Sequence, residues 1–119
     1  MKENIIQQKS YIFAIKIIKL YKYLVETKKE YILSKQLLRS GTSIGANIEE
    51  ALGGQSKKDF ISKLSIAYKE ARETKYWLSL LREGEYMSQK ELSFIFDGCE
   101  EILKIIGKIQ KTTKENNEI

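Results

Sequence analysis

The chain has 119 residues, of which 42% are hydrophobic and 31% charged, and it carries a formal net charge of +5 with no proline and no histidine. This length and composition predict one folded domain around a single core and exclude a disordered chain. The lack of histidine excludes serine–histidine and cysteine–histidine catalysis, the usual zinc sites and the Glu-x-x-His motif of di-iron bundles.

Without proline, and with Lys, Glu, Leu and Ile abundant, the composition favours an all-α chain. Helical periodicity predicts four helices, at about 4–26, 29–52, 57–83 and 89–111, within one domain spanning 1–119. Because their connections are short, we expect an antiparallel up-down-up-down four-helix bundle. The N-terminal residues are too polar for a secretory signal and no apolar run reaches membrane-spanning length, so we expect a cytoplasmic protein without a membrane partner.

The first helix has more apolar residues than one core-facing stripe needs. The core stripe consists of Ile6, Phe13, Ile17, Leu20 and Leu24. An adjacent apolar set consists of Tyr11, Ile18, Tyr21 and Val25. An apolar arc this wide favours burial against a second subunit, so we predict that the adjacent set is an oligomer interface. The alternative is that these four side chains only flank the core.

The second helix is expected to begin at the capping box Thr27-Lys28-Lys29-Glu30 and to end at Gly53-Gly54 in a left-handed conformation. Its predicted core positions are Leu33, Leu37, Ile44, Ile48 and Leu52.

Small and polar residues in the second helix form a predicted structural motif: Gly41, Gly45, Asn47 and Glu50. Each glycine costs about 1 kcal/mol relative to alanine inside a helix, so the pair predicts close packing, which we expect against Ala67 and Ala71 of the third helix. Asn47 and Glu50 share a face, and we expect them to bond one another or a neighbouring helix end.

The third and fourth helices begin at the capping signatures Ser56–Asp59 and Ser88–Glu91. The only cysteine, Cys99, falls on the core stripe of the fourth helix, where it is expected to act as a small buried hydrophobe. The polar tail from Lys111 to Ile119 is expected to fray.

Positive charge is concentrated on two helices, because residues 1–28, 29–55, 56–84 and 85–119 carry net charges of +4, 0, +3 and −2. A basic surface of this kind can contact nucleic-acid phosphates, and we expect contact at the third helix. The candidate nucleic-acid-binding residues are Lys57, Lys58, Lys63, Lys69, Arg72 and Lys75. Alternatively, these side chains pair with acids of a neighbouring subunit or are simply solvated.

The run Ser43-Ile44-Gly45-Ala46-Asn47-Ile48-Glu49-Glu50-Ala51, followed by Ser56-Lys57-Lys58-Asp59-Phe60, resembles the bacterial four-helix bundle proteins encoded within 23S rRNA intervening sequences, the so-called S23 ribosomal protein family. The usual family run is close to Ser-Ile-x-x-Asn-Ile-Ala-Glu-Gly and then Ser-x-x-Glu-Phe. This chain departs from it at Glu49, Ala51 and Asp59.

The resemblance implies a left-handed antiparallel bundle that assembles as a homopentamer, in a family whose function is largely undefined. A related group binds nucleic acid and a reverse transcriptase through a basic pentameric surface. The leading hypothesis is therefore a non-enzymatic homo-oligomer that binds RNA or another nucleic acid without cofactor or metal. The alternatives are a scaffold that binds no nucleic acid and, much less favoured, an enzyme.

Overall fold

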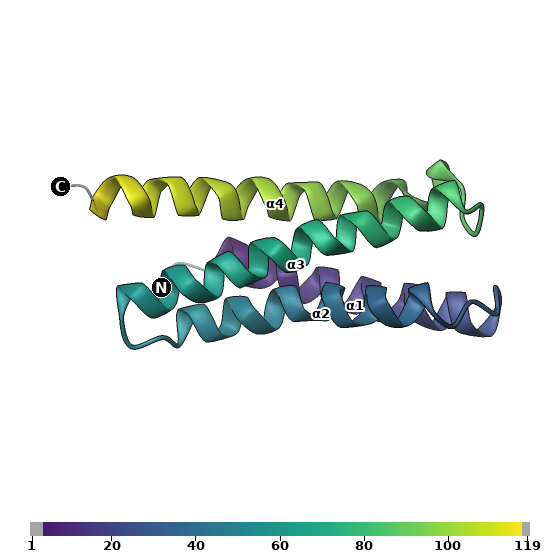
Figure 1. Ribbon diagram of the computed structural model, residues 1–119, viewed down its shortest axis with the longest axis horizontal. Coiled ribbons are helices and arrows are strands. Elements are labelled where there is room, and N and C mark those ends of the chain that lie inside the picture. The colour runs from purple at the N-terminus through teal and green to yellow at the C-terminus, as the bar shows by residue number, and fades with distance from the viewer. Residues whose placement is uncertain (1–3, 118–119) are drawn as a thin grey trace.

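The computed structural model describes residues 4–117, which form an all-α bundle (Figure 1). The helices are α1 (Ile5–Glu26), α2 (Leu33–Leu52), α3 (Lys57–Glu83) and α4 (Gln89–Asn117). Consecutive helices run antiparallel and pack in the cyclic order α1, α2, α3, α4, with α2 and α3 packed most extensively and α1 and α4 least. The four-helix prediction is confirmed. None of the described helices is long and apolar enough to cross a membrane.

Local side-chain hydrogen bonds determine where three of the helices begin. Asn4 accepts a hydrogen bond from the backbone N–H of Gln7 at the start of α1. Ser56 accepts from the N–H of Asp59 at 3.0 Å, which confirms the predicted cap of α3. Ser88 and Glu91 bond reciprocally, because the N–H of Ser88 donates to the Glu91 carboxylate and the N–H of Glu91 donates to the Ser88 hydroxyl. The predicted capping box of the fourth helix is therefore confirmed.

The predicted start of the second helix is wrong. Thr27 ends α1, Lys29 has a left-handed backbone with φ of 57°, and α2 begins only at Leu33. The buried Glu30 carboxylate accepts the N–H groups of Ile32, Leu33 and Ser34, so Glu30 itself caps α2. The capping-box interpretation failed because this carboxylate accepts the free N–H groups at the start of α2. It does not bond to the backbone of Thr27, where the predicted helix was to begin.

The predicted ends of two helices also need correction. Gly53 follows α2 as predicted, but its φ is −88°, so the helix does not end through a left-handed glycine. The fourth helix continues to Asn117, beyond its predicted end at residue 111, and the tail that was expected to fray is helical over its described part. The last two residues of that tail, Glu118 and Ile119, lie outside the described residues.

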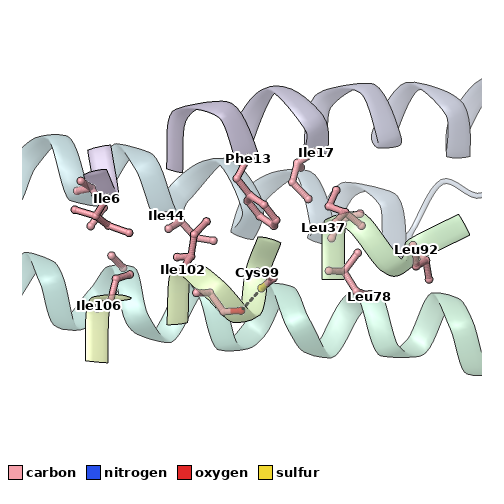
Figure 2. Close-up of a cluster of buried hydrophobic side chains, with 14 of the residues drawn as sticks. Ile6, Phe13, Ile17, Leu37, Ile44, Leu78, Leu92, Cys99, Ile102 and Ile106 are labelled. Carbon is pink, nitrogen blue, oxygen red and sulfur yellow. Dashed lines mark hydrogen bonds between the residues drawn. The ribbon is translucent and has the colours of Figure 1, made fainter. Parts of the chain in front are cut away.

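The core runs along the length of the bundle, with aliphatic side chains from all four helices (Figure 2). Ile6, Phe13 and Ile17 of α1 are buried, as predicted. Cys99 is also buried, and its thiol donates a hydrogen bond to the carbonyl of Ala71, the dashed line in Figure 2. Leu52 was expected in the core but is 40% exposed, whereas the neighbouring Ala51 is buried.

Gly41 and Gly45, the two glycines within α2, face α1 and not α3, which corrects the predicted partner. A Cβ at Gly41 would collide with Ile17, and one at Gly45 would meet the backbone of Ser10. The contact between α2 and α3 instead contains a buried hydroxyl pair, in which Thr74 and Ser40 lie 2.9 Å apart.

Candidate nucleic-acid and assembly surfaces

The six predicted nucleic-acid-binding residues of α3 do not form one cluster. Lys63 pairs with Glu50 of α2 at 3.2 Å, and Lys75 pairs with Glu100 of α4 at 3.1 Å. The Lys75 ammonium also lies 5.8 Å from the centre of the Phe96 ring. These two cations therefore join α3 to its neighbours and contribute less to an outward-facing positive surface.

The other four cations are exposed: Lys57, Lys58, Lys69 and Arg72. We name them the α3 basic surface. None of them has an ion-pair partner within residues 4–115, whose side chains the structure describes. Lys58 and Lys69 are three helical turns apart, which is about 17 Å along the axis, and Arg72 lies on the next turn of the same side. Lys58, Lys69 and Arg72 thus form a line of separated charges along α3. At its N-terminal end, Lys57 and Lys58 line an open pocket of about 430 Å³.

Two acidic side chains of α3, Glu70 and Glu73, are held to one side of this line. Arg39 of α2 donates to the carboxylates of Glu70 and Glu73, and the Trp77 indole also donates to Glu73. The hydrogen bond to Glu73 raises the pKa of Arg39 above its usual value, and the nearby Glu70 adds to that effect. Sequence patterns did not single out this cluster, because its members are contributed by two helices.

The remaining members of the predicted structural motif bond separately. The Asn47 amide donates to the carbonyl of Ser43 within α2, at 2.8 Å. Glu50 pairs with Lys63 across the contact between α2 and α3. Of the two expected arrangements, a bond between Asn47 and Glu50 is absent among the described contacts, whereas Glu50 does contact the neighbouring helix α3.

A cleft of about 580 Å³ lies between α1 and α2. We name it the α1–α2 cleft. Its lining includes Tyr11 of the predicted oligomer interface, which is 68% exposed, together with the small residues Ala14, Gly45 and Ala46. Ile18, further along α1, is exposed, whereas Tyr21 and Val25 are half-buried. The structure therefore exposes two of the four predicted interface residues and leaves the other two half-buried.

A second apolar feature was missed in the sequence. Phe94 of α4 is 86% exposed and lies with Ile12 and Lys16 of α1 along a shallow groove between these helices. We name these three residues the Phe94 ridge. Helical spacing could have predicted that Phe94 is exposed. Phe94 falls between the core positions Leu92 and Ile95 and therefore lies off the buried stripe.

The structure also bears on the single cysteine and on metal binding. Burial raises the pKa of the Cys99 thiol to about 12, so it is protonated at neutral pH. Among the described residues, no group of three or more His, Cys, Asp or Glu side chains is placed to hold a metal ion.

These features define an all-α, antiparallel four-helix bundle with a basic outer helix and two exposed apolar surfaces. The profile of the 23S rRNA-intervening sequence protein family matches residues 2–108. The chain therefore belongs to this family, and the resemblance seen in the sequence is confirmed.

The chain is closely similar to a solved structure. This is the 1.70 Å crystal structure of a protein of unknown function from the S23 ribosomal protein family of Bacteroides thetaiotaomicron. The two proteins are 52% identical and superpose with a TM-score of 0.90, over 93% of this chain and 99% of the other. No curated protein matches the chain.

Proposed function

We propose that this protein is a non-enzymatic homo-oligomer that binds RNA or another nucleic acid through the α3 basic surface. The observation that carries the proposal is the exposure of Lys57, Lys58, Lys69 and Arg72 without ion-pair partners among the described side chains. The proposed homopentamer comes from the family resemblance, and exposed Tyr11 and Ile18 on α1 support self-association. No cofactor is invoked, and the proposed compartment is the cytoplasm.

A line of cations on a helix fits a phosphate backbone better than it fits individual bases. Each phosphate that a cation neutralises releases condensed counterions, so affinity falls as salt rises. Several copies in one oligomer would multiply the number of contacts, which compensates for the few cations on each subunit. We therefore expect binding with little sequence preference and a steep salt dependence.

The test is fluorescence anisotropy with a labelled RNA hairpin and a labelled single-stranded DNA, at salt concentrations from about 50 to about 200 mM. The variant replaces Lys58, Lys69 and Arg72 with Gln. A matched control replaces Lys104, Lys108 and Lys111, three exposed lysines of α4, so that both proteins lose the same charge.

We expect the α3 variant to flatten the slope of log affinity against log salt by roughly 2 to 3, at about 0.7 to 0.9 per lost contact, and the α4 control to change it far less. Equal losses in both variants would show a non-specific charge effect. An absence of wild-type binding at low salt would contradict the proposal.

The second candidate is a scaffold that binds no nucleic acid. Lys9, Lys63 and Lys75 favour it, because each pairs with an acid of a neighbouring helix and so part of the positive charge holds the bundle together. A stable oligomer that ignores both nucleic acids in the anisotropy assay would support this function.

A further inference from the structure

We propose that the α3 basic surface binds single-stranded nucleic acid, with an unpaired base stacked on the ring of Tyr76. The inference rests on the nucleic-acid binding in the proposed function, but it names the form of nucleic acid and assigns the side chain that would select it. Self-association plays no part in it.

Tyr76 extends the line of exposed side chains that runs along the outside of α3. It follows Arg72 by four residues and Lys69 by seven, which places the three side chains on one side of the helix over roughly 10 Å along its axis. All three are exposed, and the exposed fraction of Tyr76 is 57%. A phosphate chain that follows the cations would therefore pass directly beside an aromatic ring.

The core of the bundle does not use the ring of Tyr76. The nearest buried positions on α3 are Thr74 and Leu78, two residues before it and two after it. At 3.6 residues per turn, both lie roughly 160° around the helix from Tyr76, so the ring faces away from the core. Its outer surface is thus available to a partner.

Contacts within the bundle hold the ring in place. The rings of Tyr76 and Trp77 lie edge-to-face, with their centroids 5.2 Å apart. The Trp77 indole donates to the Glu73 carboxylate at 3.1 Å, and Arg39 of α2 donates to the same carboxylate. Because these contacts fix the indole, Tyr76 has a fixed neighbour on one side. Less conformational entropy would therefore be lost when a base stacks on it.

The same contacts reduce the repulsion that nearby acids would exert on a phosphate. Two acids, Glu70 and Glu73, precede Tyr76 on α3, and Arg39 bonds to both. The cations of the α3 basic surface have no acidic partner within the described part of the chain. The charge beside the ring therefore favours a polyanion.

A ring on the convex side of a helix can stack only on a base that is unpaired. In a duplex the base faces are stacked on one another, whereas the bases of a single strand can turn outwards and stack on an aromatic ring or an arginine guanidinium. Arg72, one turn before Tyr76, supplies such a guanidinium. A duplex has the higher charge density and is favoured by cations alone, so a preference for the single strand would come from stacking.

The test measures binding of a labelled oligothymidine strand, alone and annealed to its oligoadenine complement, by fluorescence anisotropy. Tyr76→Leu removes the ring but keeps an apolar side chain, and Tyr76→Phe keeps the ring. Tyr31→Leu is the matched control, because Tyr31 is 53% exposed and lies outside α3, between α1 and α2. Circular dichroism confirms that each variant is folded.

We expect the wild type to bind the single strand more tightly than the duplex. Tyr76→Leu should weaken single-strand binding by roughly 5- to 100-fold, the effect of losing one base–aromatic stack, and should change duplex binding by less than about twofold. The slope of log affinity against log salt should stay the same, because no cation is lost. Tyr76→Phe and Tyr31→Leu should both bind as the wild type does.

Trp77 provides a second readout that needs no label. It is the only tryptophan in the chain and its ring packs against Tyr76, so a base that stacks on Tyr76 should quench the indole fluorescence. Saturating unlabelled oligothymidine should quench the wild type and Tyr31→Leu strongly and Tyr76→Leu much less. Quenching of equal depth in all three proteins would contradict stacking at Tyr76.

Other outcomes would also overturn the inference. If Tyr76→Leu weakens binding of both probes equally, or of neither, no base stacks on this ring, while phosphate binding by the cations stands. A wild type that prefers the duplex would likewise refute it. A wild type that binds neither probe at low salt would refute the proposed function itself.

Discussion

The backbone of Gly41 lies directly against the side chain of Ile17, so that a Cβ at position 41 would stand 2.7 Å from Cγ1 and 2.8 Å from Cγ2 of that residue. Ile17 is fully buried and β-branched, and it therefore has little freedom to move away. The glycine allows α1 and α2 to pack at this separation.

Gly41→Ala should destabilise the protein. Overpacking costs about 1 to 3 kcal/mol, and the better helix propensity of alanine recovers about 1 kcal/mol. We expect a net loss of up to about 2 kcal/mol in the free energy of unfolding, measured by urea denaturation. Gly107→Ala is the control, because its nearest neighbour, Tyr68, would lie at an ordinary contact distance of 3.8 Å. The control should stabilise α4, and equal effects from both substitutions would contradict the packing argument.

Glu30 should make stability depend on pH in the acid range. Burial tends to raise the pKa of this carboxyl, but hydrogen bonds from the N–H groups of Leu33, Ser34 and Ile32 outweigh it and lower the pKa below 4.5. The folded state therefore favours the ionised form. The resulting stability is complete above pH 4.5 or so and is lost as the pH falls through the lowered folded value.

Urea midpoints at neutral pH and below about pH 4 would measure this effect in wild type and in Glu30→Gln. The variant should lose about 1 kcal/mol at neutral pH, because an amide oxygen accepts more weakly than a carboxylate, and it should lose less stability on acidification. Glu26→Gln, at an exposed position at the end of α1, is the charge control. A wild-type acid dependence retained in full by Glu30→Gln would place its cause elsewhere.

The buried hydroxyl pair Ser40 and Thr74 should respond asymmetrically to removal. Thr74 also lies 2.7 Å from the carbonyl of Glu70, whereas the other contact of Ser40, to the carbonyl of Leu37, is 3.5 Å long. Thr74→Val should therefore cost about 1 to 2 kcal/mol, since it leaves the Ser40 hydroxyl poorly bonded, and Ser40→Ala should cost less. A double-mutant cycle should give a coupling of about 1 kcal/mol. Strictly additive losses would argue against an interaction between the hydroxyls.

Cys99 should react with thiol reagents only when the bundle opens. Burial raises its pKa to about 12, so almost none of the thiol is ionised near neutral pH even before access is considered. Absorbance-monitored labelling with a disulfide reagent should be slow in native protein and rapid in urea. Fast, complete labelling of the native protein would show that the side of the bundle around Ala71 and Cys99 opens readily.

Repetitive and local patterns in the sequence predicted most of the fold. The stripe through Ile6, Phe13 and Ile17 and the caps at Ser56 and Ser88 depend on residues a few positions apart, and the structure confirms them. These features are predictable because helical spacing alone brings their residues together.

Features that depend on the relative placement of helices were predicted less well. Helical spacing put Gly41 on a face with close packing but could not tell whether that face meets α1 or α3. Likewise, it could not show that Glu50 and Glu100 would pair with two of the six candidate cations. Phe94 was overlooked because a single phenylalanine off the core stripe forms no repeating pattern in the sequence. Whether its side chain is exposed depends on where the neighbouring helix lies, which only the structure shows.

The start of α1 and the end of α4 lie at the same end of the bundle, where the chain also turns from α2 into α3 (Figure 1). Three of the four neighbouring helix pairs are covalently connected, and the unconnected pair, α1 and α4, is also the least extensively packed. The order of the helices along the chain is thus a cycle with one break. A circular permutant that links Asn117 to Asn4 and opens at Gln55 would keep every helix contact and move the break to the most extensively packed pair.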